Sequence, residues 1–239
     1  KWTRDLAGVE FDLVAVATRS EGSAQKSAAN FKEWTGHEPE AYHGETPWED
    51  VLRNFPDLDV MALSTPDHLH TPVILAALEN GTHVITEKPM CLNMQEADQI
   101  IEAANAKELV VGVDMHKRYD PDHLRVRDDI SKRIGDPVYG LAVLEEPLEV
   151  STSTFKWVED SDPFSYVGPH WTDLFWHYYH SKPVALSAVG QKKRLIRDGI
   201  DAYDAVQVRV DYANGMSVHY HNNWINPDDF EGPVNQGHE

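Results

Sequence analysis

Short apolar strands alternate with helical segments through the first 113 residues, and this pattern constrains the fold more than any other feature. The continuous apolar run at residues 11–17 predicts a strand that is buried on both faces of a sheet. Further strands are predicted at 59–64, 82–86 and 109–113, with helices at 23–34, 46–53, 72–79 and 94–106. Regular alternation of this kind predicts right-handed crossovers and a doubly wound, parallel α/β sheet.

The second half of the chain has a different pattern. A helix is predicted near 122–133, a strand at 138–144 and a helix around 171–179. Residues 206–212 alternate with period two, Asn214-Gly215 is a hairpin turn, and 216–220 returns as a strand. We therefore predict two domains, a parallel-sheet domain at 1–121 and an α+β domain with a mainly antiparallel open sheet at 122–239.

The charge balance excludes some classes of partner. Lys and Arg number 21 against 40 Asp and Glu, which gives a net charge of 21 − 40 = −19. Nucleic acid and anionic membrane surfaces would repel such a chain, so neither is an expected partner. No apolar run approaches the roughly 18 residues of a membrane helix. The single cysteine, Cys91, excludes an internal disulfide and favours a reducing, cytoplasmic location.

The stretch HVITEKPM ends the strand predicted at 82–86 with two opposite charges, Glu87 and Lys88, before Pro89. One interpretation is a strand cap whose charged side chains face water. The other is a lysine held at the carboxyl end of the sheet, where ligands bind in folds of this class.

Three motifs in order decide between these interpretations. They are Ser64-Thr65-Pro66 with His70, the run from Ala76 to Val84 containing Gly81, and Glu87-Lys88-Pro89. Together they resemble the glucose–fructose oxidoreductase and inositol dehydrogenase (Gfo/Idh/MocA) family. The resemblance continues through Arg118-Tyr119, through the segment 134–139 that resembles the entry to the family's second domain, and through Asp173 and His177, which fit its D-x-x-x-H motif. It implies a Rossmann-type first domain and covers nearly the whole chain.

The resemblance implies a nicotinamide-dependent oxidoreductase that acts on a sugar, sugar acid or cyclitol. Oxidation of a secondary alcohol needs a base for the hydroxyl proton and an acceptor for the hydride. Asp173 and His177 are four residues apart and share a helix face, so the carboxylate is expected to orient the imidazole. The family's roles give Lys88, Asp173 and His177 as catalytic residues, with a cis Lys88–Pro89 peptide. The expected substrate-binding residues are Lys88, Arg118, Trp157, His170, Asp173 and His177.

Cofactor choice depends on Thr18-Arg19-Ser20, at the end of the strand predicted at 11–17. An NAD site usually presents an acidic residue there to the ribose hydroxyls. The arginine and the missing carboxylate favour the 2′-phosphate of NADP(H) over NAD(H). The expected cofactor-binding residues are Thr18, Arg19, Ser20, Ser64, Thr65, Pro66, His70, Glu87 and Lys88.

Several alternatives stay open from the sequence. Asp173 and His177 also fit a polar surface pair, and with His180 they resemble a metal-ligand set, although no further ligand pattern supports a metal. His70 also fits a packed loop histidine. The tryptophans Trp157, Trp171 and Trp176 are more typical of core or cleft wall than of substrate stacking.

The resemblance also implies a missing part. The glycine-rich phosphate loop that the family carries on its first strand is absent, and residues 2–7 are predicted to end a helix. We therefore expect an internal fragment whose sheet lacks a central strand and whose second domain stops early. Relatives usually pair through the open sheet, which implies a homodimer or homotetramer. Glycoside elimination through transient oxidation, a ligand-sensing role and an inactive fragment are the alternative functions.

Overall fold

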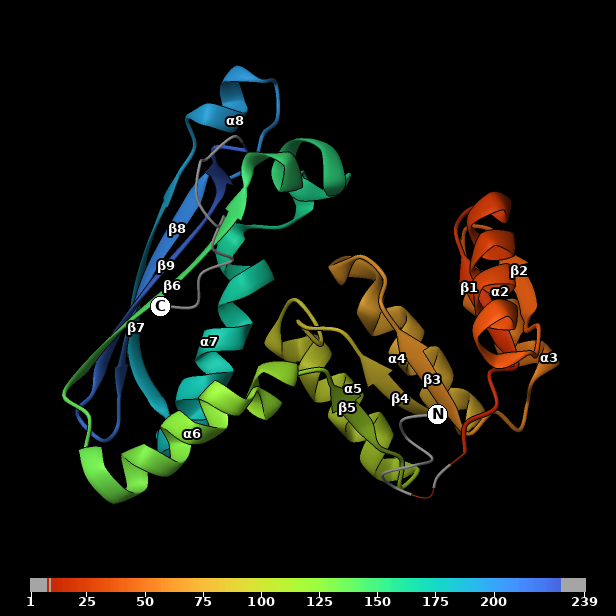
Figure 1. Cartoon of the computed structure of the whole chain (residues 1–239), viewed down its shortest axis with the longest axis horizontal. Coiled ribbons are helices and arrows are strands. Elements are labelled where there is room, and N and C mark those ends of the chain that lie inside the picture. Colours follow the sequence, from red (N-terminus) through yellow and green to blue (C-terminus); the bar gives the residue numbers. More distant parts are fainter. Residues whose placement is uncertain (1–7, 9, 229–239) are drawn as a thin grey trace. The chain divides into compact units, whose positions relative to one another are not determined.

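The computed structural model describes residue 8 and residues 10–228, and it divides into two compact units (Figure 1). Unit 1 contains residues 1–62, 72–84 and 101–111, and unit 2 contains residues 63–71, 85–100 and 112–239. The units are therefore interleaved along the sequence and do not coincide with the segments 1–121 and 122–239. That domain boundary stays a prediction, and the helix predicted at 2–7 lies outside the described residues.

Unit 1 opens with two parallel strands and two helices: β1 (Ala15–Thr18), α2 (Glu21–Thr35), β2 (Glu40–His43) and α3 (Pro47–Asn54). The Ser20 side chain caps α2 by accepting from the Ser23 amide, and Gly36 ends it with a left-handed φ of 80°. Strand β1 is shorter than predicted, because Phe11 is 65% exposed and residues 11–14 form no strand. At α3 Pro47 occupies the start of the helix, and the Thr46 side chain forms no capping bond.

The next elements follow the predicted alternation closely: β3 (Val60–Leu63), α4 (His70–Asn80), β4 (His83–Thr86), α5 (Met94–Ala106) and β5 (Val111–Val113). These strands form a sheet in the order β3-β4-β5. Helix α4 buries Val73, Ile74 and Ala77, which contribute to the core. The carboxyl ends of all three strands and the loops after them fall in unit 2.

The remainder of unit 2 is an α+β assembly. Its first elements are the 3₁₀ turn His116–Tyr119, α6 (Pro121–Asp129), the π-helical turn Ile130–Ile134 and β6 (Tyr139–Pro147). Its second group is α7 (Pro163–Tyr179), β7 (Pro183–Gln191), α8 (Arg194–Arg197), β8 (Ala205–Tyr212) and β9 (Ser217–Asn226). The strand order is β6-β9-β8-β7, with β6–β9 parallel and the other two pairings antiparallel.

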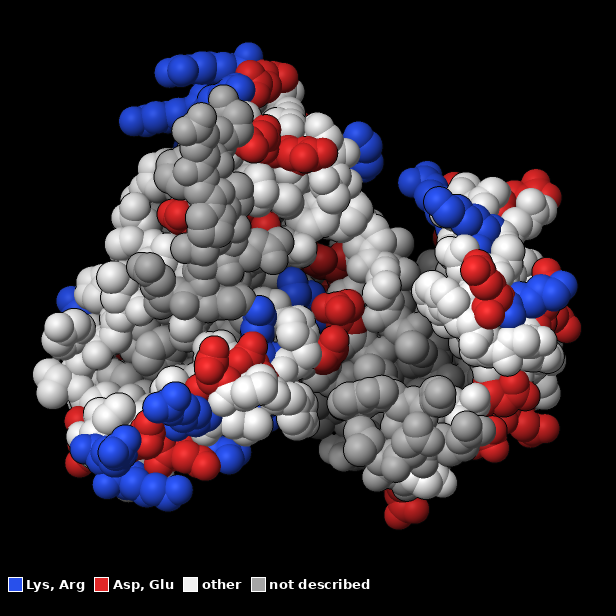
Figure 2. All heavy atoms as spheres, viewed as in Figure 1, with Lys and Arg blue, Asp and Glu red and all other residues white. Residues whose placement is uncertain are grey.

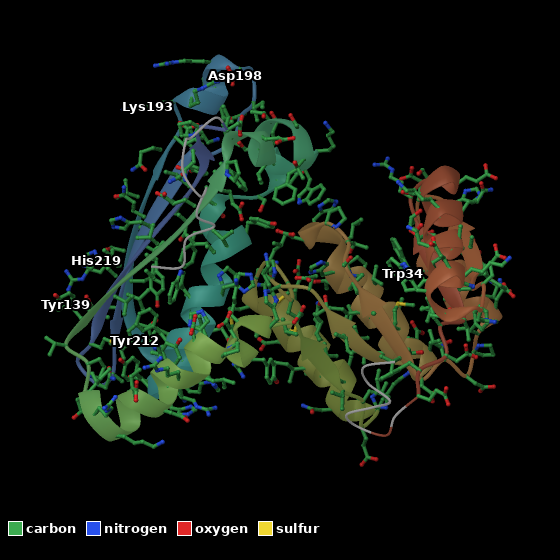
Figure 3. All side chains as sticks on the ribbon, in the orientation of Figure 1. Trp34, Tyr139, Lys193, Asp198, Tyr212 and His219 are labelled. Carbon is green, nitrogen blue, oxygen red and sulfur yellow. The ribbon has the colours of Figure 1, made fainter. Side chains whose placement is uncertain are left out.

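Helix α7 covers one face of this sheet. Inward-facing residues of β6, β8 and β9 pack with Val167, Trp171 and Leu174 of the helix around the buried Tyr220. The opposite face is open, and Figure 3 shows Tyr139 and His219 on it, while Tyr212 lies on the helix side. None of the described helices combines the length and the apolar character needed to cross a membrane.

Helix α7 starts eight residues earlier than the predicted 171–179, and this difference matters most for the site. Asp162 is its N-cap, and one carboxylate oxygen accepts from the amides of Phe164 and Ser165. Pro163 occupies the first helical position, which suits its fixed φ and missing N–H. Gly168 and Pro169 are both weak helix formers, yet both lie within this helix.

Candidate active site

Lys88 lies directly after β4 and is buried, with 8% of its surface exposed. Its Nζ donates to the backbone carbonyl of Tyr166 at 2.7 Å and lies 3.9 Å from the centre of the Tyr166 ring. The Lys88–Pro89 peptide is cis, as the resemblance implies. A buried ammonium with these contacts does not fit the solvated strand cap that the sequence left open.

A cavity of about 390 Å³ surrounds this lysine within unit 2. The loops after β3 and β4 supply part of its lining: Ser64, Thr65, Pro66, Asp67, Glu87 and Lys88. His116 and Lys117 follow β5. The remaining lining residues are Leu144, Glu146, Trp157, Tyr166, Val167 and His170. The cavity therefore joins the carboxyl ends of the strands to the sheet and helix of the α+β part.

Helix α7 carries a polar stripe along one side. Tyr166, His170, Asp173 and His177 follow one another at spacings of four, three and four residues, which places them on one helix face. Tyr166 and His170 line the Lys88 cavity, whereas Asp173 and His177 do not. Asp173 and His177 each come seven residues after their counterparts Tyr166 and His170. Seven residues rise about 10 Å along a helix, so the predicted D-x-x-x-H pair lies about two turns beyond the pair that lines the cavity.

Asp173 binds Arg118 and does not orient His177 by any described contact. The Arg118 Nε donates to Asp173 Oδ2 at 2.6 Å, and Nη2 donates to Oδ1 at 2.5 Å. The ion pair raises the pKa of the Arg118 guanidinium. His177 Nε2 is buried with no hydrogen-bond partner among the described residues. Burial and the nearby Arg118 lower the pKa of the His177 imidazole.

Burial and charge oppose each other at Lys88. Desolvation lowers the pKa of its ammonium, while Glu87, Asp67 and Glu146 raise it. Burial, with the same three carboxylates, raises the pKa of the Tyr166 phenol to about 12. Tyr166 therefore stays neutral at physiological pH and supplies a polarisable ring and a carbonyl to the lysine.

His170 contacts a second histidine in the cavity. Its ring packs edge-on against His116, with ring centroids 4.9 Å apart. Trp157 lines the same cavity and packs against Phe155 at 4.8 Å. Two predicted substrate-binding residues, Trp157 and His170, are thus brought to Lys88, while the predicted Arg118, Asp173 and His177 are not among the lining residues.

The predicted cofactor residues lie at the ends of β1, β3 and β4. Thr65 Oγ1 is buried and has no hydrogen-bond partner among the described residues, so this cavity wall offers a polar group that a bound ligand would satisfy. Arg19 forms an exposed ion pair with Glu45 at 3.3 Å. Ser20 uses its hydroxyl as the cap of α2. Thr18 donates its hydroxyl to the Ser20 carbonyl.

His70 is fully buried in unit 2. Its Nδ1 lies 2.6 Å from the Pro89 carbonyl oxygen and its Nε2 lies 2.9 Å from the Thr65 carbonyl oxygen. The ring thus links the loops that follow β3 and β4, as a packed loop histidine would, and it does not line the cavity. Its contact with a cofactor stays a prediction.

Seven lining residues were not identified from the sequence: Asp67, His116, Lys117, Leu144, Glu146, Tyr166 and Val167. A signal for Tyr166 was present, because Asp162-Pro163 is a helix start and Tyr166 precedes His170 by one turn. Glu146 follows the alternation of β6, in which Ala142, Leu144 and Glu146 are the buried positions. Among the described residues, no group of three or more His, Cys, Asp or Glu side chains could hold a metal ion.

Residues 3–115 match a family model described as "Oxidoreductase family, NAD-binding Rossmann fold" (GFO_IDH_MocA). The chain is 37% identical over 84 residues to 1,5-anhydro-D-fructose reductase of Ensifer adhaerens, covering 35% of this chain and 25% of that protein. It is 31% identical over 83 residues to the NADP(+) scyllo-inositol 2-dehydrogenase IolW of Bacillus subtilis, covering 35% of this chain and 23% of that protein.

Solved structures share the fold at lower identity. The myo-inositol 2-dehydrogenase of Lactobacillus plantarum superposes with a TM-score of 0.77 at 17% identity, covering 92% of this chain and 64% of that one. The scyllo-inositol dehydrogenase of Lactobacillus casei, solved with NAD(H) and scyllo-inositol, gives a TM-score of 0.74 at 15% identity, covering 90% and 63%. Over eight of the curated relatives that match, the chain spans 19% to 46% of the relative's length.

Proposed function

Through residues 3–115 the chain belongs to the Gfo/Idh/MocA oxidoreductase family, and from this premise we propose its reaction. It transfers a hydride between a nicotinamide cofactor and a secondary alcohol or ketone of a sugar or cyclitol. The observation that carries the proposal is the buried Lys88, whose Nζ lies in a cavity beside the helix that presents His170. The relatives' substrates, sugars and inositols, support the substrate class.

The bound cofactor supplies the chemistry of accepting or giving a hydride at the substrate carbon. His170 takes the hydroxyl proton in oxidation and returns it in reduction, because a neutral imidazole accepts a proton at one ring nitrogen and can later donate it. Lys88 donates a hydrogen bond to the same oxygen and stabilises the charge that develops there. Tyr166 holds the lysine through its carbonyl and its ring. We assign the acid–base role to His170 instead of His177, and make Asp173 a positioning residue through Arg118.

The residues present fit a nicotinamide cofactor. The wall formed by the strand ends is lined by Ser64, Thr65, Pro66 and Glu87. The buried Thr65 hydroxyl there has no hydrogen-bond partner in the part of the chain that the structure describes, so it can bind a cofactor group. We propose NADP(H) over NAD(H), because β1 ends in Thr18 instead of an acidic residue and Arg19 follows it. Its exposed pair with Glu45 is weak, so the guanidinium is available to a 2′-phosphate. Titration of NADP(H) and NAD(H) in parallel tests this preference.

We also propose a homodimer or homotetramer formed through the open face of the β6-β9-β8-β7 sheet. Tyr139, Leu141 and Val189 are 78%, 56% and 60% exposed. Leu141 is paired with His219 and Val189 with Gln207, which places apolar and polar side chains side by side on that face. Light scattering after gel filtration measures the oligomer. A cytoplasmic location is proposed from the free Cys91 and is tested by cell fractionation.

The experiment compares turnover in the full-length protein with that of Lys88→Met and His170→Asn. We expect kcat to fall by about 10²–10⁴ in each variant, because each loses a group that acts in the transition state. Asp173→Asn is expected to lose less, since it acts through Arg118. The exposed Lys26→Met serves as the control. Unchanged turnover in the Lys88 variant, or a larger loss at His177→Asn than at His170→Asn, would contradict the assignment.

A further inference from the structure

The cavity around Lys88 carries more negative than positive charge. Asp67, Glu87 and Glu146 line it with Lys88 and Lys117, so that with neutral histidines the formal balance is 2 − 3 = −1. Asp67 and Glu146 are buried, at 6% and 8% exposure, and are therefore weakly screened by solvent. Neither α6 nor α8, over which Lys and Arg side chains gather in Figure 2, contributes a lining residue.

The three carboxylates come from different walls of the cavity. Asp67 and Glu87 belong to the loops after β3 and β4, where the nicotinamide cofactor is proposed to bind. Glu146 belongs to β6 and lines the other wall with Leu144, Trp157 and His170. It is close enough to Lys88 and Tyr166 to raise the pKa of both side chains.

We propose that Glu146 restricts the substrate to neutral polyhydroxy compounds, sugars and cyclitols without a carboxylate or phosphate; this rests on the proposed function. An ionised carboxylate only accepts hydrogen bonds, so it binds hydroxyl groups that donate to it. An anionic substrate would place a second negative charge against a buried one, and like charges in such contact are strongly unfavourable. The face of Trp157 suits the C–H surface of a neutral ring.

Lys88 does not reverse this selectivity. Its ammonium already donates to the Tyr166 carbonyl and faces that ring, and three carboxylates line the same cavity. The sugar acids allowed by the family resemblance are therefore excluded from the proposed substrates. Glu146 acts as a specificity residue, distinct from Lys88 and His170, which act on the reacting oxygen.

The test uses matched pairs in which a neutral sugar and its uronic acid share a ring: glucose with glucuronate and galactose with galacturonate. Reduced cofactor is followed by absorbance, and binding is measured separately by calorimetry. We expect the wild-type protein to prefer the neutral member of a pair by about tenfold or more, and Glu146→Gln to reduce that ratio at least about tenfold. The adjacent Glu145→Gln is the control, because Glu145 binds Asn223 and Asn226.

The outcomes separate this inference from the proposed function. A wild-type protein that oxidises uronates as well as neutral sugars overturns the specificity and leaves the oxidoreductase intact, as does an unchanged ratio in a folded Glu146→Gln variant. If calorimetry shows that the protein binds neutral sugars preferentially but none of them is turned over, the proposed specificity is supported and the proposed oxidoreductase activity is overturned. Binding of neither class overturns the specificity. If Glu146→Gln fails to fold, the wild-type ratio alone decides.

Discussion

The ion pair between Arg118 and Asp173 joins the turn after β5 to the middle of α7 through two parallel hydrogen bonds. Bidentate pairs of this kind are stronger than single contacts, although the arginine side chain here is 35% exposed and partly screened. The Asp173 side chain is only 11% exposed, so loss of Arg118 leaves a largely buried carboxylate without its counter-ion. Loss of Asp173 leaves a guanidinium that water can still reach.

A double-mutant cycle should resolve this asymmetry. We expect Arg118→Met to lower the free energy of unfolding by about 2 kcal/mol and Asp173→Asn by about 1 kcal/mol, with a coupling energy of about 1 kcal/mol. Chemical denaturation measures all three. The exposed pair Arg209–Asp211 provides the matched cycle, for which a coupling near zero is expected. Equal coupling energies in the two cycles would show that burial does not strengthen the Arg118–Asp173 ion pair.

His177 makes stability depend on pH. Burial, with Arg118 and Arg127 nearby, holds the pKa of its imidazole below the ordinary 6.5, against the opposite effect of Asp173. Below pH 6.5 the unfolded chain therefore binds a proton that the native protein does not, and stability falls as the pH drops. Above that pH the contribution is fully present.

Replacement of this residue should flatten the acid side of the profile. We expect the melting temperature of His177→Asn to fall less than that of the wild type between pH 7 and pH 5, because the variant lacks the half-buried imidazole whose pKa is lowered. Differential scanning fluorimetry measures the profiles, and the exposed His37→Asn is the control. A variant profile parallel to the wild type would show that other groups set the acid limb.

At the scale of elements, the start of α7 determines which of its residues reach Lys88. The Asp162 carboxylate holds the first turn through the amides of Phe164 and Ser165. Tyr166 and His170 lie in the turns that follow, so a frayed start would displace both. The cap is therefore a structural support for the candidate site.

Removal of the cap should affect stability and turnover together. Asp162→Ala is expected to lower the free energy of unfolding by about 1–2 kcal/mol, as is usual for an N-cap, and to reduce kcat as the helix start frays. Asp160→Ala is the control, since Asp160 is exposed in the preceding 3₁₀ turn. Loss of stability with unchanged kcat would separate the cap from the site.

The sequence predicted elements well where a pattern was strong. The strands and helices from β3 to β5, and the hairpin at Asn214-Gly215, are confirmed because apolar runs and turn residues mark them clearly. Strands β2 and β7 were missed because neither is a buried strand of the kind that an apolar run predicts. Strand β2 is the run Glu40–His43, with no buried residue, and β7 is exposed on nearly every residue. Gly168 and Pro169 hid the first half of α7.

The candidate site was predicted in part for the same reason. Lys88 was found because three ordered motifs surround it, and His170 and Trp157 were placed among the substrate residues. The sequence predicted Asp173 and His177 for the acid–base role from the D-x-x-x-H motif. We propose His170 for that role because His170, with Tyr166, lines the cavity around Lys88. Glu146 was missed because it lies beyond the strand predicted at 138–144, and its burial is visible only from its packing.

At the scale of the whole molecule, the open sheet face is the surface that we propose for assembly. Leu141→Lys places a cation beside His219 and on the face that carries Arg209, so we expect the proposed dimer to dissociate at least about tenfold more readily. The melting temperature should change little, because Leu141 is 56% exposed. Light scattering across a dilution series measures the change, and Leu92→Lys, 43% exposed, is the control. Dissociation of both variants, or of neither, would place the interface elsewhere.

The interleaving of the two units has a consequence for dissection of the protein. The chain crosses from one unit to the other at five points, the last between Val111 and Gly112. A cut there would yield one piece with Thr65 and Lys88 and another with Glu146, Trp157 and His170. Neither piece would contain all the residues that line the cavity. Recovery of sugar binding after the two pieces are mixed would therefore show that unit 2 had reassembled from two separate polypeptides.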